Sequence, residues 1–255
     1  MHPRFFLLPE GTRPGPDGTV ALAGEEAVHL RRVLRLREGD RVHLADGTGW
    51  RAPARVRRIG AGRGNGPRVV LELAGPAEEV DDLVPVHLLV AVLKKEAMDW
   101  LVQKAAELGA ARLQPVVTAR TVVRLDSSRA GARLERWRGL ARQALKQCRG
   151  GRVTEVAPVA PLEAALAACA GLPGRFFLWE GGGRPLARAW AELGRPLPCA
   201  VLVGPEGGFE AGEAARVEAA GFVPAGLGPR ILRGETAAVA ALAVLAGLRG
   251  GGAGP

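Results

Sequence analysis

Cysteine and histidine are scarce in this sequence, and their spacing excludes two kinds of site. The three cysteines, Cys148, Cys169 and Cys199, are odd in number and far apart, with no Cys-x-x-Cys. They fit neither a disulfide framework nor a zinc site. The four histidines show no metal-ligand spacing either, so we expect no bound metal.

The sequence also lacks a long apolar run. The longest nearly apolar stretch, Ala237 to Leu248, has 12 residues, well short of the ~20 needed to cross a bilayer. Near the N-terminus only Phe5 to Leu8 are continuously apolar, which is too short for a secretory signal. We therefore expect a soluble, cytoplasmic protein with no membrane partner.

What the sequence does have is an ordinary globular composition with an uneven positive charge. Hydrophobic residues make up 47% of 255 residues, which suits one large domain or two small ones. Residues 1–75 hold 13 basic and 8 acidic residues, and residues 126–152 hold 8 and 2. Clustered basic charge favours a polyanionic partner such as RNA, although a bias toward arginine in composition would also raise the net charge.

Residues 1–75 read as a small β-barrel-like module. Short apolar or alternating runs separated by turn residues predict strands, and Val28, Leu30, Val33 and Leu34 lie at helical spacing. The predicted strands span residues 2–8, 18–23, 41–46, 50–59 and 68–74, the helix spans Glu25 to Leu36, and a glycine-rich loop spans Gly60 to Pro67. Five strands with one helix are typical of a small barrel.

From an acidic linker at Gly75 to Pro85 onward, apolar runs alternate with amphipathic helices. The runs span 86–93, 112–117, 176–179, 200–203 and 222–227, and the helices span 95–108, 129–149, 162–170, 184–193, 210–220 and 236–248. Continuously apolar strands that alternate with helices predict a parallel sheet covered on both faces.

Two loops between an apolar strand and a helix could bind a ligand. The first, Gly204 to Phe209, holds three glycines, where backbone N–H groups are accessible and a ligand can approach closely. It has neither the dinucleotide-binding spacing nor the Lys-Ser/Thr of a phosphate loop. The second, Leu227 to Thr236, carries Arg230, Arg233 and Glu235. A tight turn without ligand for the first loop, and a capped helix start with solvated arginines for the second, remain alternatives.

Two basic segments are candidates for contact with RNA. Arg133, Arg136 and Arg149 belong to a helix that is basic over a broad face, which is also typical of a solvated surface. In the N-terminal helix, His29, Arg32 and Arg35 are placed to bind phosphate, or to flank a buried ridge of Val33 and Leu34.

With these segments in hand, the chain resembles the RsmE-type family of small-subunit ribosomal RNA methyltransferases, which belongs to the SPOUT superfamily. The motifs that carry the resemblance follow one another over nearly the whole chain. They are His29, Val33-Leu34-Arg35 and Gly39-Asp40; Gln103-Lys104-Ala105 and Glu107-Leu108-Gly109; Gln147-Cys148-Arg149; Gly204 to Phe209; and Leu227 to Ala237. The family commonly has Thr where this chain has Gly234.

The resemblance implies an α/β fold with two parts. Residues 1–75 would form a PUA-like RNA-binding β-barrel, and residues 76–255 a SPOUT-type parallel sheet with a trefoil knot. It implies a homodimer that binds S-adenosylmethionine and methylates N3 of a uridine in 16S ribosomal RNA, either free or in the assembled small subunit. Because knots are essentially absent from other folds, no sequence pattern alone predicts this one.

By the same resemblance, the cofactor lies between the two loops and the end of the strand at 176–179. The implied cofactor-binding residues are Leu178, Glu180, Gly204, Pro205, Glu206, Gly207, Gly208, Leu227, Gly228, Ile231, Leu232 and Thr236. Loss of the uracil N3 proton leaves an anion, which a positioned arginine stabilises. Arg233 is our first candidate for that role and Arg230 the second, and the base is Glu235 or water.

Two other functions are compatible with these features. A 2′-O-ribose RNA methyltransferase of the same superfamily would use the same cofactor pocket. A non-catalytic RNA-binding module would need the basic surface but no intact glycine loop.

Overall fold

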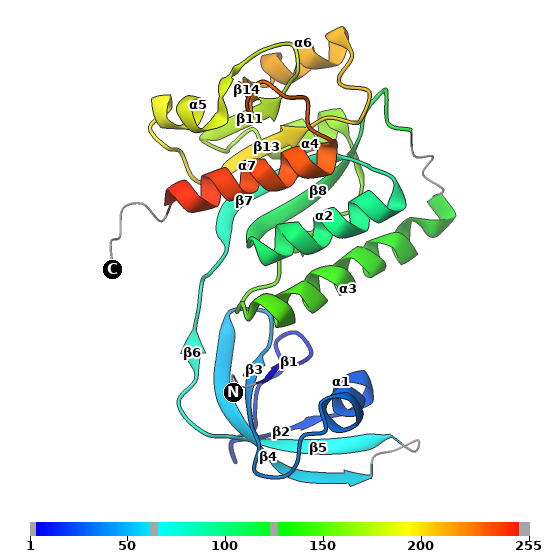
Figure 1. Ribbon diagram of the computed structural model, residues 1–255, viewed down its shortest axis with the longest axis vertical. Coiled ribbons are helices and arrows are strands. Elements are labelled where there is room, and N and C mark those ends of the chain that lie inside the picture. Colours follow the sequence, from blue (N-terminus) through cyan, green and yellow to red (C-terminus); the bar gives the residue numbers. More distant parts are fainter. Residues whose placement is uncertain (1–3, 62–65, 123–126, 250–255) are drawn as a thin grey trace. The chain divides into compact units, whose positions relative to one another are not determined.

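The computed structural model describes residues 4–61, 66–122 and 127–249, and the chain folds as two compact units (Figure 1). The first unit consists of residues 1–82 and 145–153, and the second of residues 83–144 and 154–255. The sequence predicted a single boundary between residues 75 and 76. It did not predict that residues 145–153 return to the first unit.

The first unit is built on a six-stranded sheet with the order β1-β3-β4-β5-β2, in which β6 pairs with β4. Its strands are β1 (Arg4–Leu7), β2 (Thr19–Leu22), β3 (Arg41–Ala45), β4 (Trp50–Ala61), β5 (Pro67–Leu73) and β6 (Glu78–Glu79). The five predicted strands form, although residues 2 and 3 lie outside the described part of the chain. The predicted loop from Gly60 to Pro67 is shorter than expected, because β4 and β5 extend into it on both sides of residues 62–65, which are not described.

The single regular helix predicted over Glu25 to Leu36 is wrong. The structure has a short helix, α1 (Gly24–Val28), followed by a π-helical turn, η1 (His29–Val33). The amide of Leu34 donates to the carbonyl of His29 at 3.0 Å, five residues back. This wider turn buries Leu30 and packs Leu34 against the core, whereas Val33, expected in a buried ridge, is 64% exposed.

Residues 145–153 belong to the first unit because they pack on it and share its hydrogen bonds. Leu145 is buried with Leu7 and Ala45. The carboxylate of Asp82 accepts hydrogen bonds from the backbone amides of Gly151 and Arg152, at 2.7 and 3.2 Å. These contacts join parts of the chain that local sequence patterns cannot relate.

The second unit is built on an eight-stranded sheet in which every pair is parallel, in the order β10-β8-β7-β13-β11-β14-β12, with β9 also paired to β8. Its strands are β7 (Val84–Ala91), β8 (Ala110–Val117), β9 (Glu155–Val156), β10 (Ala160–Pro161), β11 (Gly174–Leu178), β12 (Arg184–Pro185), β13 (Cys199–Val203) and β14 (Val223–Gly226). The prediction of a parallel sheet is confirmed, and all five predicted strands form. The short strands β9, β10 and β12 were missed because two residues carry no periodic pattern.

Six helices accompany this sheet, close to the predicted positions. They are α2 (Lys95–Glu107), α3 (Ala130–Cys148), α4 (Leu162–Ala168), α5 (Leu186–Glu192), α6 (Ala211–Ala219) and α7 (Gly234–Arg249). A 3-10 turn, η3 (Ser127–Arg129), precedes α3. Helix α7 begins two residues earlier than expected, with the amide of Ala237 donating to the carbonyl of Arg233 at 2.8 Å.

Helices cover both faces of the sheet, as the continuously apolar strands require. On one face α7 packs on β7 and β13 and lies beside α2 (Figure 1). On the other face α4 and α6 bury a cluster that includes Phe177, Leu202 and Phe209. Strand β13 is buried along its whole length. Within the described ranges, no helix combines the length and apolarity needed to span a membrane.

Replacing Phe177 with Ala tests this packing. Phe177 is fully buried, with ring centroids of Trp179 and Phe209 at 5.9 and 6.1 Å, so its truncation is expected to lower the free energy of unfolding by about 3–5 kcal/mol. Urea unfolding followed by circular dichroism measures the change. Leu193→Ala, at a side chain that is 49% exposed, is the control and should change the free energy by no more than about 0.5 kcal/mol.

Candidate functional site

A cavity of about 890 Å³ lies at the carboxyl edge of the parallel sheet in the second unit. Its walls come from the segments that follow β7, β13, β11 and β14, which are consecutive neighbours in the sheet. Carboxyl ends of parallel strands meet at one edge, and open α/β sheets bind ligands there. The two glycine-containing loops singled out in the sequence therefore open on the same cavity.

The loop after β13 is a tight turn. The amide of Gly208 donates to the carbonyl of Pro205 at 2.9 Å, and Gly208 has a φ of +69°, which side chains rarely adopt. At Gly204 a Cβ would lie 2.9 Å from the ring of Phe209. Glycine at both positions lets the chain turn sharply at the end of a fully buried strand.

The loop after β14 leads directly into α7. Gly228 has a φ of +111°, and the chain then passes Arg230 and Arg233 before α7 begins at Gly234. A Cβ on Gly234 would lie 3.2 Å from the Leu93 side chain and 3.4 Å from the carbonyl oxygen of Gly204. Glycine here allows α7 to approach the loop after β13 closely, at the position where the related family commonly has threonine.

The segment after β11 forms the third wall. A Cβ on Gly183 would lie 2.9 Å from the backbone nitrogen of Ala225 in β14, so this glycine allows close backbone packing. The carboxylate of Glu180 lies against the glycine loop, with Oε1 2.6 Å from the position of a Cβ on Gly208.

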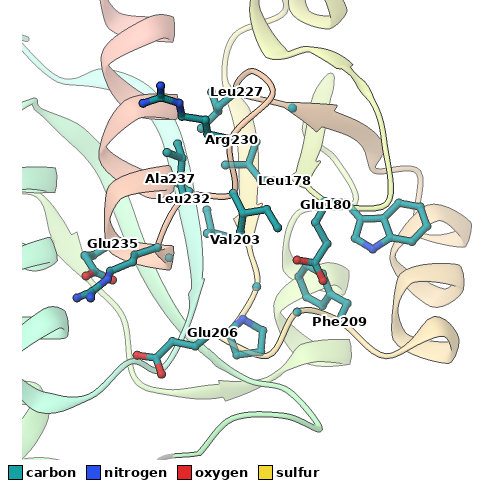
Figure 2. A pocket seen from close by; sticks show the side chains of 18 of the residues that line it. Leu178, Glu180, Val203, Glu206, Phe209, Leu227, Arg230, Leu232, Glu235 and Ala237 are labelled. Atoms are coloured by element: carbon teal, nitrogen blue, oxygen red, sulfur yellow. The ribbon is translucent and has the colours of Figure 1, made fainter.

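The cavity has an apolar floor and charged edges. Figure 2 shows Leu178, Val203, Leu227 and Leu232 gathered at its centre, with carboxylates and Arg230 around them. The charged lining residues are Lys94, Glu96, Glu180, Glu206, Arg230, Arg233 and Glu235. Within the part of the chain that the structure describes, no carboxylate pairs with the guanidinium of Arg230 or Arg233. Such a cavity can hold a ligand that is partly apolar and partly charged.

Most residues predicted around a cofactor line this cavity. They are Leu178, Glu180, Gly204, Pro205, Glu206, Gly208, Leu227, Gly228, Ile231 and Leu232, together with the predicted catalytic residues Arg230, Arg233 and Glu235. Gly207 and Thr236 are not in the lining. The carbonyl of Gly207 accepts a hydrogen bond from Arg120 at 2.9 Å, and Arg120 is not in the lining either. Thr236 is exposed on α7, since two helical steps of ~100° turn it away from Gly234.

Sequence analysis missed the wall formed at the start of α2. Lys94, Glu96 and Ala97 line the cavity, and Lys94 Nζ lies 3.9 Å from a carboxylate oxygen of Glu206. Their position directly after an apolar strand could have predicted that they lie at the carboxyl edge of the sheet. Only the strand order, however, reveals that β7 is the neighbour of β13.

The residues predicted to contact RNA are distributed over both units. In the first unit His29 packs edge-on to Phe6, while Arg32 and Arg35 are exposed. Arg35 has a φ of +54° and lies beyond the end of η1, so it does not share one helix with His29 and Arg32 as predicted. Arg149 is exposed just after α3. In the second unit Arg133 is partly buried.

Arg136, also in the second unit, is engaged by a carboxylate. Its Nη2 and Nε donate to Asp99 Oδ2 at 2.7 and 3.1 Å. Trp137, the next residue of α3, is buried.

The buried thiols of the second unit are not activated. Burial raises the pKa of the Cys199 thiol to about 12 and also raises the pKa of Cys169, against the opposing effect of Arg112 and Arg175. Both thiols are therefore protonated at neutral pH and inert as nucleophiles. Neither residue lines the cavity.

Comparison with known proteins agrees with this architecture. The family model described as an RNA methyltransferase domain matches residues 81–246, and that of an RNA methyltransferase PUA domain matches residues 22–63. The ribosomal RNA small subunit methyltransferase E of Bacillus subtilis is 29% identical, over 95% of this chain and 95% of its own length.

Two solved structures are similar over nearly the whole chain. The ribosomal RNA small subunit methyltransferase E of Neisseria gonorrhoeae, bound to S-adenosyl methionine, has a TM-score of 0.82 and 31% identity, covering 97% of this chain and 98% of that chain. A methyltransferase of Legionella pneumophila, solved with the bound cofactor SAM, has a TM-score of 0.81 and 27% identity, with the same coverage.

The fold and the cavity define an α/β enzyme whose ligand site lies at the carboxyl edge of a parallel sheet. The chain belongs to the ribosomal RNA small subunit methyltransferase E family of RNA methyltransferases. The resemblance inferred from the sequence motifs is confirmed, as is the enzyme class.

Replacing Gly183 with Ala tests the close approach between the third wall and β14. The new Cβ would lie about 3 Å from backbone atoms of Pro224 and Ala225, which cannot yield as a flexible side chain does. We expect a loss of about 1–3 kcal/mol, measured as a drop in melting temperature of about 2–4 °C per kcal/mol. Gly171→Ala is the control, because a Cβ there meets nothing within 4 Å. An equal melting temperature for both variants would contradict the inferred packing.

Proposed function

We propose that this protein transfers the methyl group of S-adenosylmethionine to N3 of a uridine in 16S ribosomal RNA. The observation that carries the proposal is the cavity shared by the loop after β13 and the loop after β14, with two arginines at its edge. The names of the Bacillus and Neisseria relatives and the S-adenosyl methionine bound to the Neisseria and Legionella structures support the same activity.

The residues of the cavity suit S-adenosylmethionine. Its size falls within the 300–1,000 Å³ that is typical of small-ligand sites. The apolar side chains of Leu178, Leu227 and Leu232 offer a surface for an adenine ring, and the carboxylates of Glu180 and Glu206 suit a ligand that carries positive charge. When bound, this cofactor supplies an electrophilic methyl group on a sulfonium.

Arg233 is proposed to stabilise the uracil anion. The neutral N3 of uracil has no available lone pair, so its proton must leave before or during methylation. A guanidinium near O2 or O4 stabilises the charge that develops, as positioned donors do. Arg233 and Arg230 line the cavity free of carboxylate partners among the described residues, and Glu235, in the first turn of α7, is the candidate base, with water as the alternative.

The proposal extends to the fold and the partners. Residues 1–75 would act as a PUA-like RNA-binding barrel, with His29, Arg32 and Arg35 in contact with phosphates, and residues 76–255 as a SPOUT-type domain with a trefoil knot. The insertion of β14 between β11 and β12 supports the knot. Arg133, Arg136 and Arg149 would add contacts to the RNA. The active form would be a cytoplasmic homodimer acting on 16S ribosomal RNA or the assembled small subunit.

The target uridine should be unpaired or flipped out of its helix. N3 lies on the Watson–Crick edge and is inaccessible while the base is paired. Mapping the modified nucleosides of 16S ribosomal RNA by mass spectrometry in a deletion strain tests the function directly. Loss of one N3-methyluridine is expected, whereas loss of a 2′-O-methylated nucleoside instead would identify a ribose methyltransferase.

Replacing Arg233 with Ala tests the proposed mechanism. Removal of a donor to a developing anion is expected to lower kcat by about 10²–10³-fold, with a much smaller change in the affinity for S-adenosylmethionine. Transfer of a tritiated methyl group to 16S ribosomal RNA measures kcat, and calorimetry measures the affinity. Arg188→Ala, an exposed arginine of α5 that pairs with Glu192, is the control. A variant with normal turnover would remove Arg233 from the mechanism.

A further inference from the structure

The glycine loop is held from outside the cavity by a segment that follows β8. This segment, Thr118-Ala119-Arg120-Thr121, is itself a closed turn. The amide of Thr121 donates to the carbonyl of Thr118 at 3.1 Å, and the amide of Thr118 donates to Thr121 Oγ1 at 2.9 Å. Thr118 is buried, so Arg120 extends from a turn with a fixed backbone.

Arg120 contacts the glycine loop at the centre of its turn. Its Nη1 donates to the carbonyl of Gly207 at 2.9 Å, and its Nε lies 3.8 Å from Glu210 Oε1. Because the carbonyl of Gly207 belongs to the Gly207–Gly208 peptide, this hydrogen bond restrains the orientation of that peptide. Glu180 lies against Gly208, so the turn is confined on a second side.

A buried carboxylate joins the same two segments. Glu213, in the first turn of α6, is only 3% exposed. Its Oε1 accepts the amide of Ala119 at 2.7 Å, and its Oε2 accepts the amide of Glu210 at 3.1 Å. Burial of a carboxylate is costly unless hydrogen bonds to the charged form offset it, and here one carboxylate ties the segment after β8 to the exit of the glycine loop.

These contacts reach across the sheet. Strand β7 lies between β8 and β13, yet residues that follow β8 hold the loop that follows β13. Neither Arg120 nor Glu213 lines the cavity, so neither is placed to touch a ligand within it.

We propose that Arg120 and Glu213 are positioning residues that hold the glycine loop in the conformation that binds S-adenosylmethionine. The proposal rests on the proposed function, because it assigns these two residues a part in the affinity of that site for its cofactor. A loop fixed before binding loses less conformational freedom when the ligand arrives, so its loosening weakens binding rather than the chemical step.

The test compares Arg120→Ala, Arg120→Lys and Glu213→Gln with the wild type in the full-length protein. Calorimetry gives the Kd for S-adenosylmethionine, methyl transfer to 16S ribosomal RNA gives KM for the cofactor and kcat, and thermal unfolding gives Tm. Arg216→Ala is the matched control, because Arg216 lies on α6 like Glu213 but forms only an exposed ion pair with Glu163 of α4.

Arg120→Ala should raise both Kd and KM for S-adenosylmethionine about tenfold, which corresponds to the loss of one hydrogen bond from a charged donor. At saturating cofactor, kcat should stay within about threefold of the wild type, and Arg120→Lys should restore part of the affinity, since lysine can still donate to the Gly207 carbonyl. Glu213→Gln keeps the volume but turns an amide toward one of the two backbone donors, so it should raise Kd and KM similarly. The control should match the wild type in Kd, KM and kcat.

Three outcomes would overturn the proposal. Unchanged Kd and KM in Arg120→Ala and Glu213→Gln would show that the loop keeps its shape without these contacts. A lower Tm and lower kcat with an unchanged KM would assign both residues to stability alone. If the wild type itself bound no S-adenosylmethionine, the proposed function would fail, and the positioning role would fail with it. If instead the wild type and all the variants bound it equally well, only the positioning role would fail.

Discussion

The close approach of helix α7 to the end of strand β13 is the constraint on which the site depends. Gly234 faces the carbonyl of Gly204, and Leu93, which follows β7, packs beside it. Three chain segments that are far apart in the sequence thus meet where α7 begins. A Cβ at 234 would lie 3.2 Å from the Leu93 side chain and 3.4 Å from the carbonyl oxygen of Gly204, so a larger residue here would require the Leu93 side chain to shift slightly. The start of α7 thus brings the loops after β13 and β14 to one cavity.

Local features of the sequence predicted much of this arrangement. The apolar runs and amphipathic helices of the second unit were recognisable because burial on both faces leaves strands without polar positions. The two loops stood out because glycine, together with arginines before a helix, interrupts that pattern. Each loop was recognised as a possible ligand site from its place after an apolar strand, whereas their common site around one cofactor was implied by the family resemblance. The specific family came from the motifs, not from the periodicity.

The remaining features are properties of the tertiary structure. The sheet order, which brings Lys94 beside Glu206, is not encoded in any one segment. The π-helical turn at His29–Val33 lets Leu34 pack against the core. The helical spacing of apolar residues does not predict such a turn. Residues 145–153 join the first unit through Asp82, more than sixty positions earlier. The hydrogen bond from Arg120 to Gly207 likewise links segments whose sequences give no sign of each other.

The distribution of charge around the cavity is consistent with two ligands of opposite sign. Glu180 and Glu206 follow β11 and β13, whereas Arg230 and Arg233 follow β14 together with Glu235, so both guanidinium groups come from one wall while carboxylates come from several. A sulfonium donor is favoured near the carboxylates, and an RNA base that loses a proton is favoured near the arginines. Because close backbone packing at Gly183 holds one wall against β14, the placement of these charges is built into the fold before either ligand binds. Preorganised charges of this kind need no rearrangement as the reaction proceeds, which is how a site with little covalent chemistry of its own can still lower a barrier.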